Sequence, residues 1–222
     1  MARGSGDERR TYGQACPIAH ALDMIGERWA LLVVRELRLG PRRYADLQAA
    51  LPGIGPSVLS QRLRDLERFG VLAHRALPPP ASAKVYELTE WGSELEPVFA
   101  ALRRWGLRSP VIPLEGVLTS DTVLLGLRAY FQPQPHAAWS ASYRIELERE
   151  VYGVEVADGE LTAVRRGEEP RSPDVAVTTD HDTLQSVLSH ERPLAEAVEA
   201  GELTVEGDGE VMERLVAAVQ RR

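Results

Sequence analysis

The chain has 222 residues, and 44% of them are hydrophobic, which suffices for packed cores and excludes a wholly disordered protein. No apolar stretch approaches the ~20 residues that a membrane-spanning helix needs, and the polar N-terminus has no signal-peptide core. We therefore expect a cytoplasmic protein with no membrane partner. Because Cys16 is the only cysteine, an internal disulfide and a multi-cysteine zinc site are also excluded.

The net charge of −7 is divided unevenly along the chain. Residues 1–110 hold 16 Arg and Lys against 12 Asp and Glu, a net charge of +4. Residues 111–222 hold 10 against 21, a net charge of −11. Such asymmetry suggests two modules with different partners, and only the first module suits a phosphate backbone.

Three short helices are predicted first, from apolar residues at helical spacing. The first begins at Pro17 and ends at Gly26, and the next two span about residues 28–39 and 44–51. The first helix is expected to bury a stripe of Ile18, Leu22 and Ile25. A tight turn with two glycines, residues 52–55, follows the third helix.

The stretch between Pro56 and Gly70 is predicted to be an amphipathic helix. Leu59, Leu63 and Leu66 form its core stripe. Its opposite face offers polar and basic groups without aliphatic bulk: Ser57, Ser60, Gln61, Arg64 and Arg68. Arg and Gln on such a helix read guanine and adenine in a DNA major groove. A plain solvated face is the alternative for this helix alone, but the preceding helix and turn favour a helix-turn-helix.

Two short strands, at about 71–77 and 84–88, flank a proline-rich tip at 78–83 and predict a hairpin wing. Arg75 and Lys84 stand on either side of the tip, where cations reach phosphates or a minor groove. The alternative is an ordinary surface hairpin with two solvated charges.

Thr89 is predicted to cap a long helix that runs to about Gly106 and is kinked or divided at Pro97. An aromatic-rich apolar stripe follows it: Trp91, Leu95, Val98, Phe99, Leu102 and Trp105. Because such a stripe needs a covering surface, we expect it to form a dimer interface together with Ile18 and Leu22. The alternative is packing against the second domain of the same chain.

Several motifs occur in this half in a characteristic order. They include Cys16-Pro17-Ile18, Gly26-Glu27-Arg28-Trp29, Gly40-Pro41-Arg42-Arg43-Tyr44 and Leu59-Ser60-Gln61-Arg62-Leu63. Together they resemble the HxlR-type winged helix-turn-helix regulators, relatives of MarR. The resemblance implies a mainly α winged domain at 14–107, after an arm at 1–13, that binds double-stranded DNA as a homodimer on a palindromic operator. Most relatives that resemble it repress.

The DNA-binding residues expected from the helix, the wing and the resemblance are Arg42, Arg43, Ser57, Ser60, Gln61, Arg62, Arg64, Arg68, Arg75 and Lys84.

In some relatives of this type the cysteine of the Cys-Pro motif is a thiol switch, which makes Cys16 a candidate for redox sensing. A reactive thiol needs exposure and a lowered pKa. The alternative is a small buried hydrophobic residue at a helix start. Without a second cysteine, only a bridge between subunits or a small-thiol adduct is open to Cys16.

Residues 108–119 contain two prolines and are predicted to be a linker. After them, an α+β module is expected over 120–222. Its predicted helices lie at about 120–131, 182–190, 193–200 and 209–220. Its predicted strands lie at about 143–147, 152–156, 161–165, 175–177 and 203–206, with a hairpin turn at Asp158-Gly159.

This second module is similar to the sterol carrier protein type 2-like fold. The resemblance is carried by Val154-Glu155-Val156-Ala157-Asp158-Gly159-Glu160-Leu161 and by the segments 173–180 and 201–208. It implies an apolar cavity for a lipid-like or aromatic small molecule. The candidate lining residues, each of which could instead be ordinary core, are Leu127, Phe131, Trp139, Tyr143, Tyr152, Leu184 and Leu188.

No phosphate-binding loop, nucleophile turn or zinc-protease motif occurs, and the five histidines are scattered. We therefore expect a regulator rather than an enzyme, with no catalytic residue, no cofactor and no metal. The leading hypothesis is a dimeric DNA-binding regulator tuned by a ligand in the second domain. The alternatives are a thiol sensor and a constitutive DNA binder whose second domain only dimerises.

Overall fold

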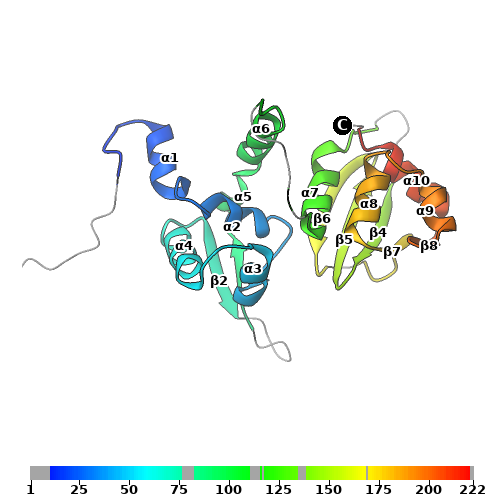
Figure 1. Cartoon of the computed structure of the whole chain (residues 1–222), viewed down its shortest axis with the longest axis horizontal. Coiled ribbons are helices and arrows are strands. Elements are labelled where there is room, and N and C mark those ends of the chain that lie inside the picture. The colour runs from blue at the N-terminus through cyan, green and yellow to red at the C-terminus, as the bar shows by residue number, and fades with distance from the viewer. Residues whose placement is uncertain are drawn as a thin grey trace, which may run out of the picture. The chain divides into compact units, whose positions relative to one another are not determined.

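The computed structural model describes residues 11–76, 83–110, 116, 118–134, 139–168 and 170–220. The chain divides into two compact units, Met1–Glu96 and Pro97–Arg222 (Figure 1). Most of the predicted wing tip, Pro113 of the predicted linker and residues 1–10 of the arm lie outside the described residues.

The first unit is a helical domain with a small sheet. Its elements are α1 (Pro17–Ile25), α2 (Ala30–Glu36), β1 (Arg42–Arg43), α3 (Tyr44–Ala50), α4 (Pro56–Arg68), β2 (Leu72–Ala76), β3 (Lys84–Leu88) and α5 (Glu90–Ser93). The three strands lie in the order β1-β3-β2, and both pairings are antiparallel. This is the winged helix-turn-helix arrangement that the sequence predicts.

A buried leucine stripe attaches α4 to the rest of the first unit. Leu59, Leu63 and Leu66 are almost fully buried, as the spacing predicts. At the end of α4, Gly70 adopts a φ of 73°, and the amide of Val71 donates to the carbonyl of Leu66 over 2.9 Å. A left-handed residue at this place ends a helix and turns the chain into the next strand.

The structure differs from the predicted first half at three places. Ile18 is 71% exposed and Leu22 is also exposed, so two of the three residues that were expected to be buried face outward, while Ile25 is half-buried. Trp29 has a φ of 78°, which delays the second helix to Ala30. The strand β1 is not predicted, because two residues are too few to show a period.

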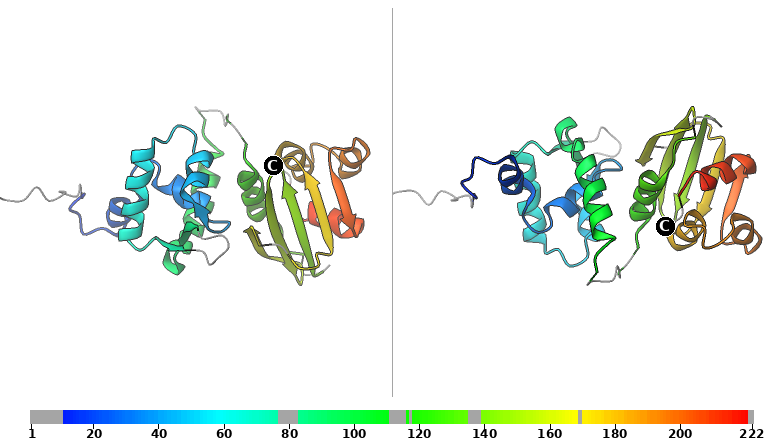
Figure 2. Two further views of the ribbon diagram at one scale, coloured as in Figure 1. Left: turned by 90° about the horizontal axis from the view of Figure 1, so that it is seen from below. Right: turned by 90° about the horizontal axis from the view of Figure 1, so that it is seen from above.

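The second unit contains α6 (Glu96–Gly106, which begins at the last residue of the first unit), α7 (Ser120–Tyr130), β4 (Ala141–Leu147), β5 (Glu150–Ala157), β6 (Glu160–Arg166), β7 (Val175–Thr179), α8 (His181–Leu188), α9 (Leu194–Glu199), β8 (Thr204–Gly207) and α10 (Gly209–Ala217). Its five strands form one sheet in the order β6-β5-β4-β7-β8 (Figure 2). Only the β4–β7 pairing is parallel. The predicted α+β architecture is therefore confirmed.

Pro97 divides the predicted long helix into α5 and α6. Proline is tolerated in the first turn of α6, where its missing N–H has no partner to lose. Arg103 of α6 lies 4.4 Å from the ring centre of Tyr130 and donates to the carbonyl of Ala129 over 3.4 Å. These contacts join α6 to α7, whereas the sequence predicts the domain boundary after residue 107.

The sheet buries one face against helices. In β4, Tyr143, Ile145 and Leu147 are buried, while Arg144 and Glu146 on the other face form an ion pair of 2.9 Å. The predicted hairpin turn is confirmed, since Asp158 and Gly159 both have positive φ. None of the helices in the described part of the chain combines the length and hydrophobicity that a membrane crossing requires.

Candidate nucleic-acid interface

The start of α4 is fastened to α3 by a tyrosine. The hydroxyl of Tyr44 donates to the carbonyl of Pro56 over 2.9 Å and accepts from the hydroxyl of Ser60 over 3.3 Å. In the turn between the helices, the amide of Gln48 donates to the carbonyl of Ile54 over 2.6 Å, and Gly53 has a φ of 89°. The position of α4 is therefore set by side-chain bonds as well as by its buried leucines.

The face of α4 opposite the leucines is polar and basic. Ser57, Arg64 and Arg68 are exposed, and Gln61 lies half-buried between them. Their spacing places all four on one side of the helix. These groups offer the donors and acceptors that major-groove reading requires.

Sequence reasoning missed one residue beside this face. Val58 is 39% exposed in the first turn of α4 and adds an apolar group at the edge of the polar face. A valine methyl group in this place can contact the methyl group of thymine. The sequence could have predicted its exposure, because Val58 does not share the spacing of the buried leucines.

A hydrogen-bond chain runs along the outer face of α4. The amide nitrogen of Gln61 donates to Asp65 over 3.0 Å, and Arg64 donates to the amide oxygen of Gln61 over 2.7 Å. Arg68 donates to the same Asp65 oxygen over 3.1 Å. Gln61 and Arg68 are thus linked through the carboxylate of Asp65, to which the sequence analysis gives no role, and Arg64 joins them through Gln61.

The wing carries its cations on an antiparallel pair of strands. Arg75 lies opposite Val85, and Ala76 lies opposite Lys84. Both cations are exposed, and Arg75 donates to Glu87 over 2.8 Å. The positive charge of Arg75 is therefore partly neutralised within the hairpin.

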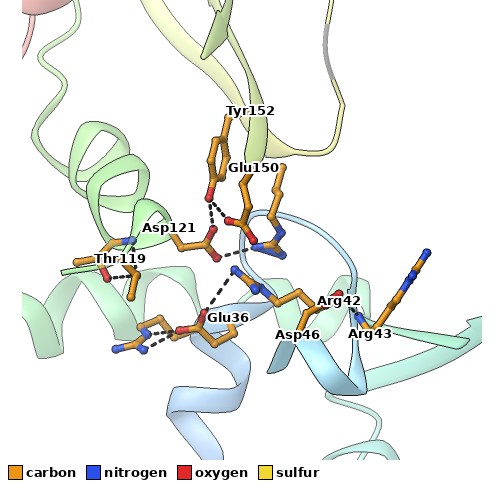
Figure 3. Close-up of polar contacts among 11 residues, drawn as sticks. Glu36, Arg42, Arg43, Asp46, Thr119, Asp121, Glu150 and Tyr152 are labelled. Carbon is orange, nitrogen blue, oxygen red and sulfur yellow. Dashed lines mark hydrogen bonds and ion pairs between the residues drawn. The ribbon is translucent and has the colours of Figure 1, made fainter. Parts of the chain in front are cut away.

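Arg42 does not fit its predicted role as a DNA contact. It is 7% exposed, and its guanidinium lies 3.8 Å from the carboxylate of the buried Glu36 (Figure 3). Arg35 also donates to Glu36, over 2.6 and 2.8 Å. Arg42 therefore neutralises a buried carboxylate and joins β1 to α2. Its neighbour Arg43 is exposed, as a DNA contact requires.

Two further predicted contacts are partly engaged within the protein. Arg62 has 17% of its side chain exposed and lies 3.7 Å from both Glu27 and Asp65. Ser60 uses its hydroxyl proton for Tyr44. Neither residue points outward as the four face residues do, because both lie on the flanks of α4.

The residues predicted to form a dimer interface are largely uncovered within each unit. Ile18, Leu22 and Trp91 are exposed in the first unit. In the second unit, Val98, Leu102 and Trp105 are exposed, Trp105 by 79%, and Phe99 is half-buried. In the first unit, a cavity of about 170 Å³ lies between α1 and α5, beside Trp91 and Leu95.

The residues predicted to line a ligand cavity are packed against protein atoms. All seven are at most 8% exposed: Leu127, Phe131, Trp139, Tyr143, Tyr152, Leu184 and Leu188. The space beside Leu127 and Leu188 is about 10 Å³, which is at most the room of one water molecule. Beside these two leucines there is no room for a lipid-sized molecule, and a ligand cavity lined by the seven residues stays a prediction.

The polar ends of the two central aromatic residues already have partners. The indole nitrogen of Trp139 donates to the hydroxyl of Tyr143 over 3.1 Å, and that hydroxyl donates to the carbonyl of Val211 over 3.0 Å. Burial raises the pKa of Tyr143, although the bond from Trp139 opposes the shift. The N–H of Trp139 and the O–H of Tyr143 are therefore both already engaged with protein atoms.

A second buried polar cluster connects α7 with β5 and β6. The hydroxyl of Tyr152 contacts Asp121 over 2.7 Å and also bonds Glu150 (Figure 3). Arg166 pairs with Asp121 over 2.6 Å. Burial raises the pKa of Tyr152 strongly, and the two neighbouring carboxylates raise it further. The cluster holds Tyr152 in its neutral form.

Cys16 occupies the N-cap position of α1, where its side chain makes no capping hydrogen bond, and it is half-buried. Its thiol is neither fully enclosed, as a core residue would be, nor fully open.

Two protein families match separate parts of the chain. The HxlR-like helix-turn-helix family matches residues 24–110. The alkyl sulfatase C-terminal family matches residues 134–221. The second match differs from the predicted sterol carrier likeness, which is not supported; the α+β fold of this region is all that stands of that prediction.

Curated relatives resemble the first half. The chain is 37% identical over 106 residues to the HTH-type transcriptional regulator sll1512 of Synechocystis sp., covering 48% of this chain and 78% of that one. It is 32% identical over 91 residues to the HTH-type transcriptional regulator YodB of Bacillus subtilis, covering 40% of this chain and 81% of YodB.

Among solved structures, the reduced form of YodB from B. subtilis matches 45% of this chain and all of that chain, with 29% identity and a TM-score of 0.40. The sequence matches and the winged fold of residues 11–76 and 83–96 agree with one another. The chain therefore belongs to the HxlR-like helix-turn-helix family of transcriptional regulators.

Proposed function

We propose that this protein binds a two-fold symmetric operator as a homodimer and represses transcription there. The observation that carries the proposal is the outer face of α4, on which Ser57, Gln61, Arg64 and Arg68 stand clear of the leucine core. One α4 would enter the major groove of each half-site, with half-sites about one DNA turn, ~34 Å, apart. Arg75 and Lys84 of the wing supply positive charge for phosphates beside each half-site.

The uncovered apolar side chains support the dimer. Large hydrophobic residues exposed at helical spacing are typical of a surface that a partner covers. Val98, Leu102 and Trp105 recur on one side of α6, and Ile18 and Leu22 do so on α1. Repression is the proposed direction of regulation because a dimer seated on a promoter excludes polymerase, and the resembling relatives mostly repress.

The experiment first selects the preferred duplex from a random DNA library with the full chain. Binding is then measured by fluorescence anisotropy at several salt concentrations, and the oligomeric state by sedimentation. We expect a dimer and a palindromic preferred site. A monomer, or a protein indifferent to every duplex at low salt, would contradict the proposal.

A matched pair of variants tests the dimer surface. Leu102→Asp places a charge among the exposed apolar residues of α6, whereas Ala100→Asp places the same charge on the opposite, exposed side of that helix. We expect dissociation to monomers for Leu102→Asp only. Equal behaviour of the two variants would remove α6 from the interface.

The second candidate is constitutive DNA binding, with a second domain that only dimerises. The packing of Trp139 and Tyr143 favours it, since a ligand would first have to displace their mutual bond. Titration with a fatty acid and with a small aromatic acid tests this, with tryptophan fluorescence and operator affinity as the two readouts. A ligand that changed both would restore the ligand-tuned alternative.

A third candidate is thiol sensing, which the partial exposure of Cys16 keeps open. Diamide should then abolish operator binding by the wild type and leave Cys16→Ser unaffected. Equal sensitivity of the two proteins would exclude it.

A further inference from the structure

We infer that Asp65 is a positioning residue for base reading: its carboxylate orients the amide of Gln61 so that α4 prefers adenine at one place in the operator. This inference rests on the proposed function, because it assigns a role within the same DNA-reading face.

Asp65 is where several side chains of α4 meet. One of its oxygens accepts from Gln61 over 3.0 Å and from Arg68 over 3.1 Å. Its other oxygen lies 3.7 Å from Arg62. With 16% of its side chain exposed, the carboxylate is sheltered beneath the groups that it holds. It therefore supports the face rather than forming part of it.

The contact fixes which way the Gln61 amide points. A carboxylate accepts hydrogen bonds and donates none, so only the nitrogen end of the amide can face Asp65. From the other side, Arg64 can only donate, and it does so to the amide oxygen over 2.7 Å. The two neighbours therefore agree on a single orientation.

The bonds leave Gln61 with the groups that adenine recognition needs. A glutamine amide has two N–H donors and an oxygen with two acceptor sites. Asp65 uses one donor and Arg64 uses one acceptor site, so one of each remains. Glutamine reads adenine with one donor to N7 and one acceptor for the N6 amino group.

The charge of Asp65 makes this role separable from general affinity. A carboxylate close to DNA repels phosphates, so electrostatics alone disfavours an acid at this position. Removing it should leave non-specific binding unchanged or tighter, while weakening the preference for the operator. A purely structural residue would weaken both together.

The test compares Asp65→Ala with Glu67→Ala, using the selected operator and a scrambled duplex at one salt concentration. Glu67 lies on the same helix and pairs with His74 of the wing, away from Gln61. Both variants remove one negative charge. We expect the ratio of the two affinities to fall about tenfold for Asp65→Ala and to be unchanged for Glu67→Ala.

Three further measurements make the result specific to Gln61. In a Gln61→Ala background, Asp65→Ala should have no further effect on the ratio. Asp65→Asn, whose amide oxygen can still accept from Gln61, should keep most of the preference. Replacing the recognised adenine by 7-deazaadenine should reduce wild-type binding but not binding by Asp65→Ala.

The outcomes distinguish a failure of the proposed function from a failure of the role assigned to Asp65. A wild-type protein without any sequence preference would overturn the proposed function and this inference together. A sequence-specific wild type with an unchanged ratio in Asp65→Ala, or with effects that add in the double variant, would overturn only the role of Asp65. Should Asp65→Ala fail to fold, Asp65→Leu, whose side chain is of similar size but has no acceptor for Gln61, replaces it in every comparison.

Discussion

The polar side chains on the outer face of α4 differ from those inside the second unit in how many of their hydrogen-bonding groups are already used. On α4, Arg64 bonds Gln61, while Gln61 and Arg68 bond Asp65, and all three keep further donors at the surface. In the second unit, Tyr143 and Tyr152 are fully buried, and their hydroxyls bond protein atoms. Polar groups that retain unused bonds at a surface are suited to recognition, whereas saturated buried groups stabilise a fold.

The adjacent residues Arg42 and Arg43 differ in the same way, one being buried and the other exposed. Their substitution gives the largest expected difference in stability. Arg42→Ala should lower the free energy of unfolding by about 3 kcal/mol, the low end for a broken buried ion pair, because Arg35 still bonds the buried Glu36. Arg43→Ala should change it by about 0.5 kcal/mol or less, since Arg43 is exposed. Urea unfolding of both variants checks this, and similar losses would contradict the burial argument.

Tyr152 tests the buried cluster of the second unit. Tyr152→Phe keeps the ring but leaves Asp121 without its hydroxyl donor, and we expect a loss of about 1–3 kcal/mol near neutral pH.

The same tyrosine predicts a pH dependence. Its pKa is raised on folding, so its stabilisation is present below the unfolded pKa of about 10 and is lost as the pH rises above that value. Stability measured from pH 8 to 11 should fall more steeply for the wild type than for Tyr152→Phe. Parallel curves would argue against the raised pKa.

The reading face should lose binding rather than stability. Gln61→Ala or Arg64→Ala should each weaken operator binding by about 1–3 kcal/mol and relax base preference at one position. Anisotropy with single-base operator variants measures both effects.

Arg75 and Lys84 form the matched comparison on the wing. Alanine at either position should weaken binding to all sequences and reduce the slope of the salt dependence by about one. A uniform loss in all four alanine variants would contradict the division between reading and positioning.

Val58 carries the smallest expected effect. Val58→Ala should weaken operator binding by about 0.8 kcal/mol for each methyl or methylene group that no longer contacts a thymine methyl. The thymines of the operator can be replaced one at a time by deoxyuridine, which lacks the methyl group. At one position the wild type should lose the same binding free energy, and Val58→Ala should lose none.

The sequence predicted the elements better than the roles of their charged residues. The period of Leu59, Leu63 and Leu66 located α4, and Asp158-Gly159 located a hairpin, because both signals are local. The burial of Arg42 was not predictable, since it depends on Glu36 of a different element. The predicted ligand cavity stays a prediction for a related reason: alternation indicates which residues face inward but not whether they fill the space.

The bond from Tyr44 to the carbonyl of Pro56 fixes the rotation of α4 about its own axis, because it holds the first turn while the five residues 51–55 span the gap from α3. Successive residues of a helix are turned by about 100°. A turn of that size would bring the buried leucines to the surface, so an additional residue in the connection should bulge out of the loop and leave the helix in place. The tyrosine bond and the leucines thus make the choice of outward side chains independent of the length of this short loop.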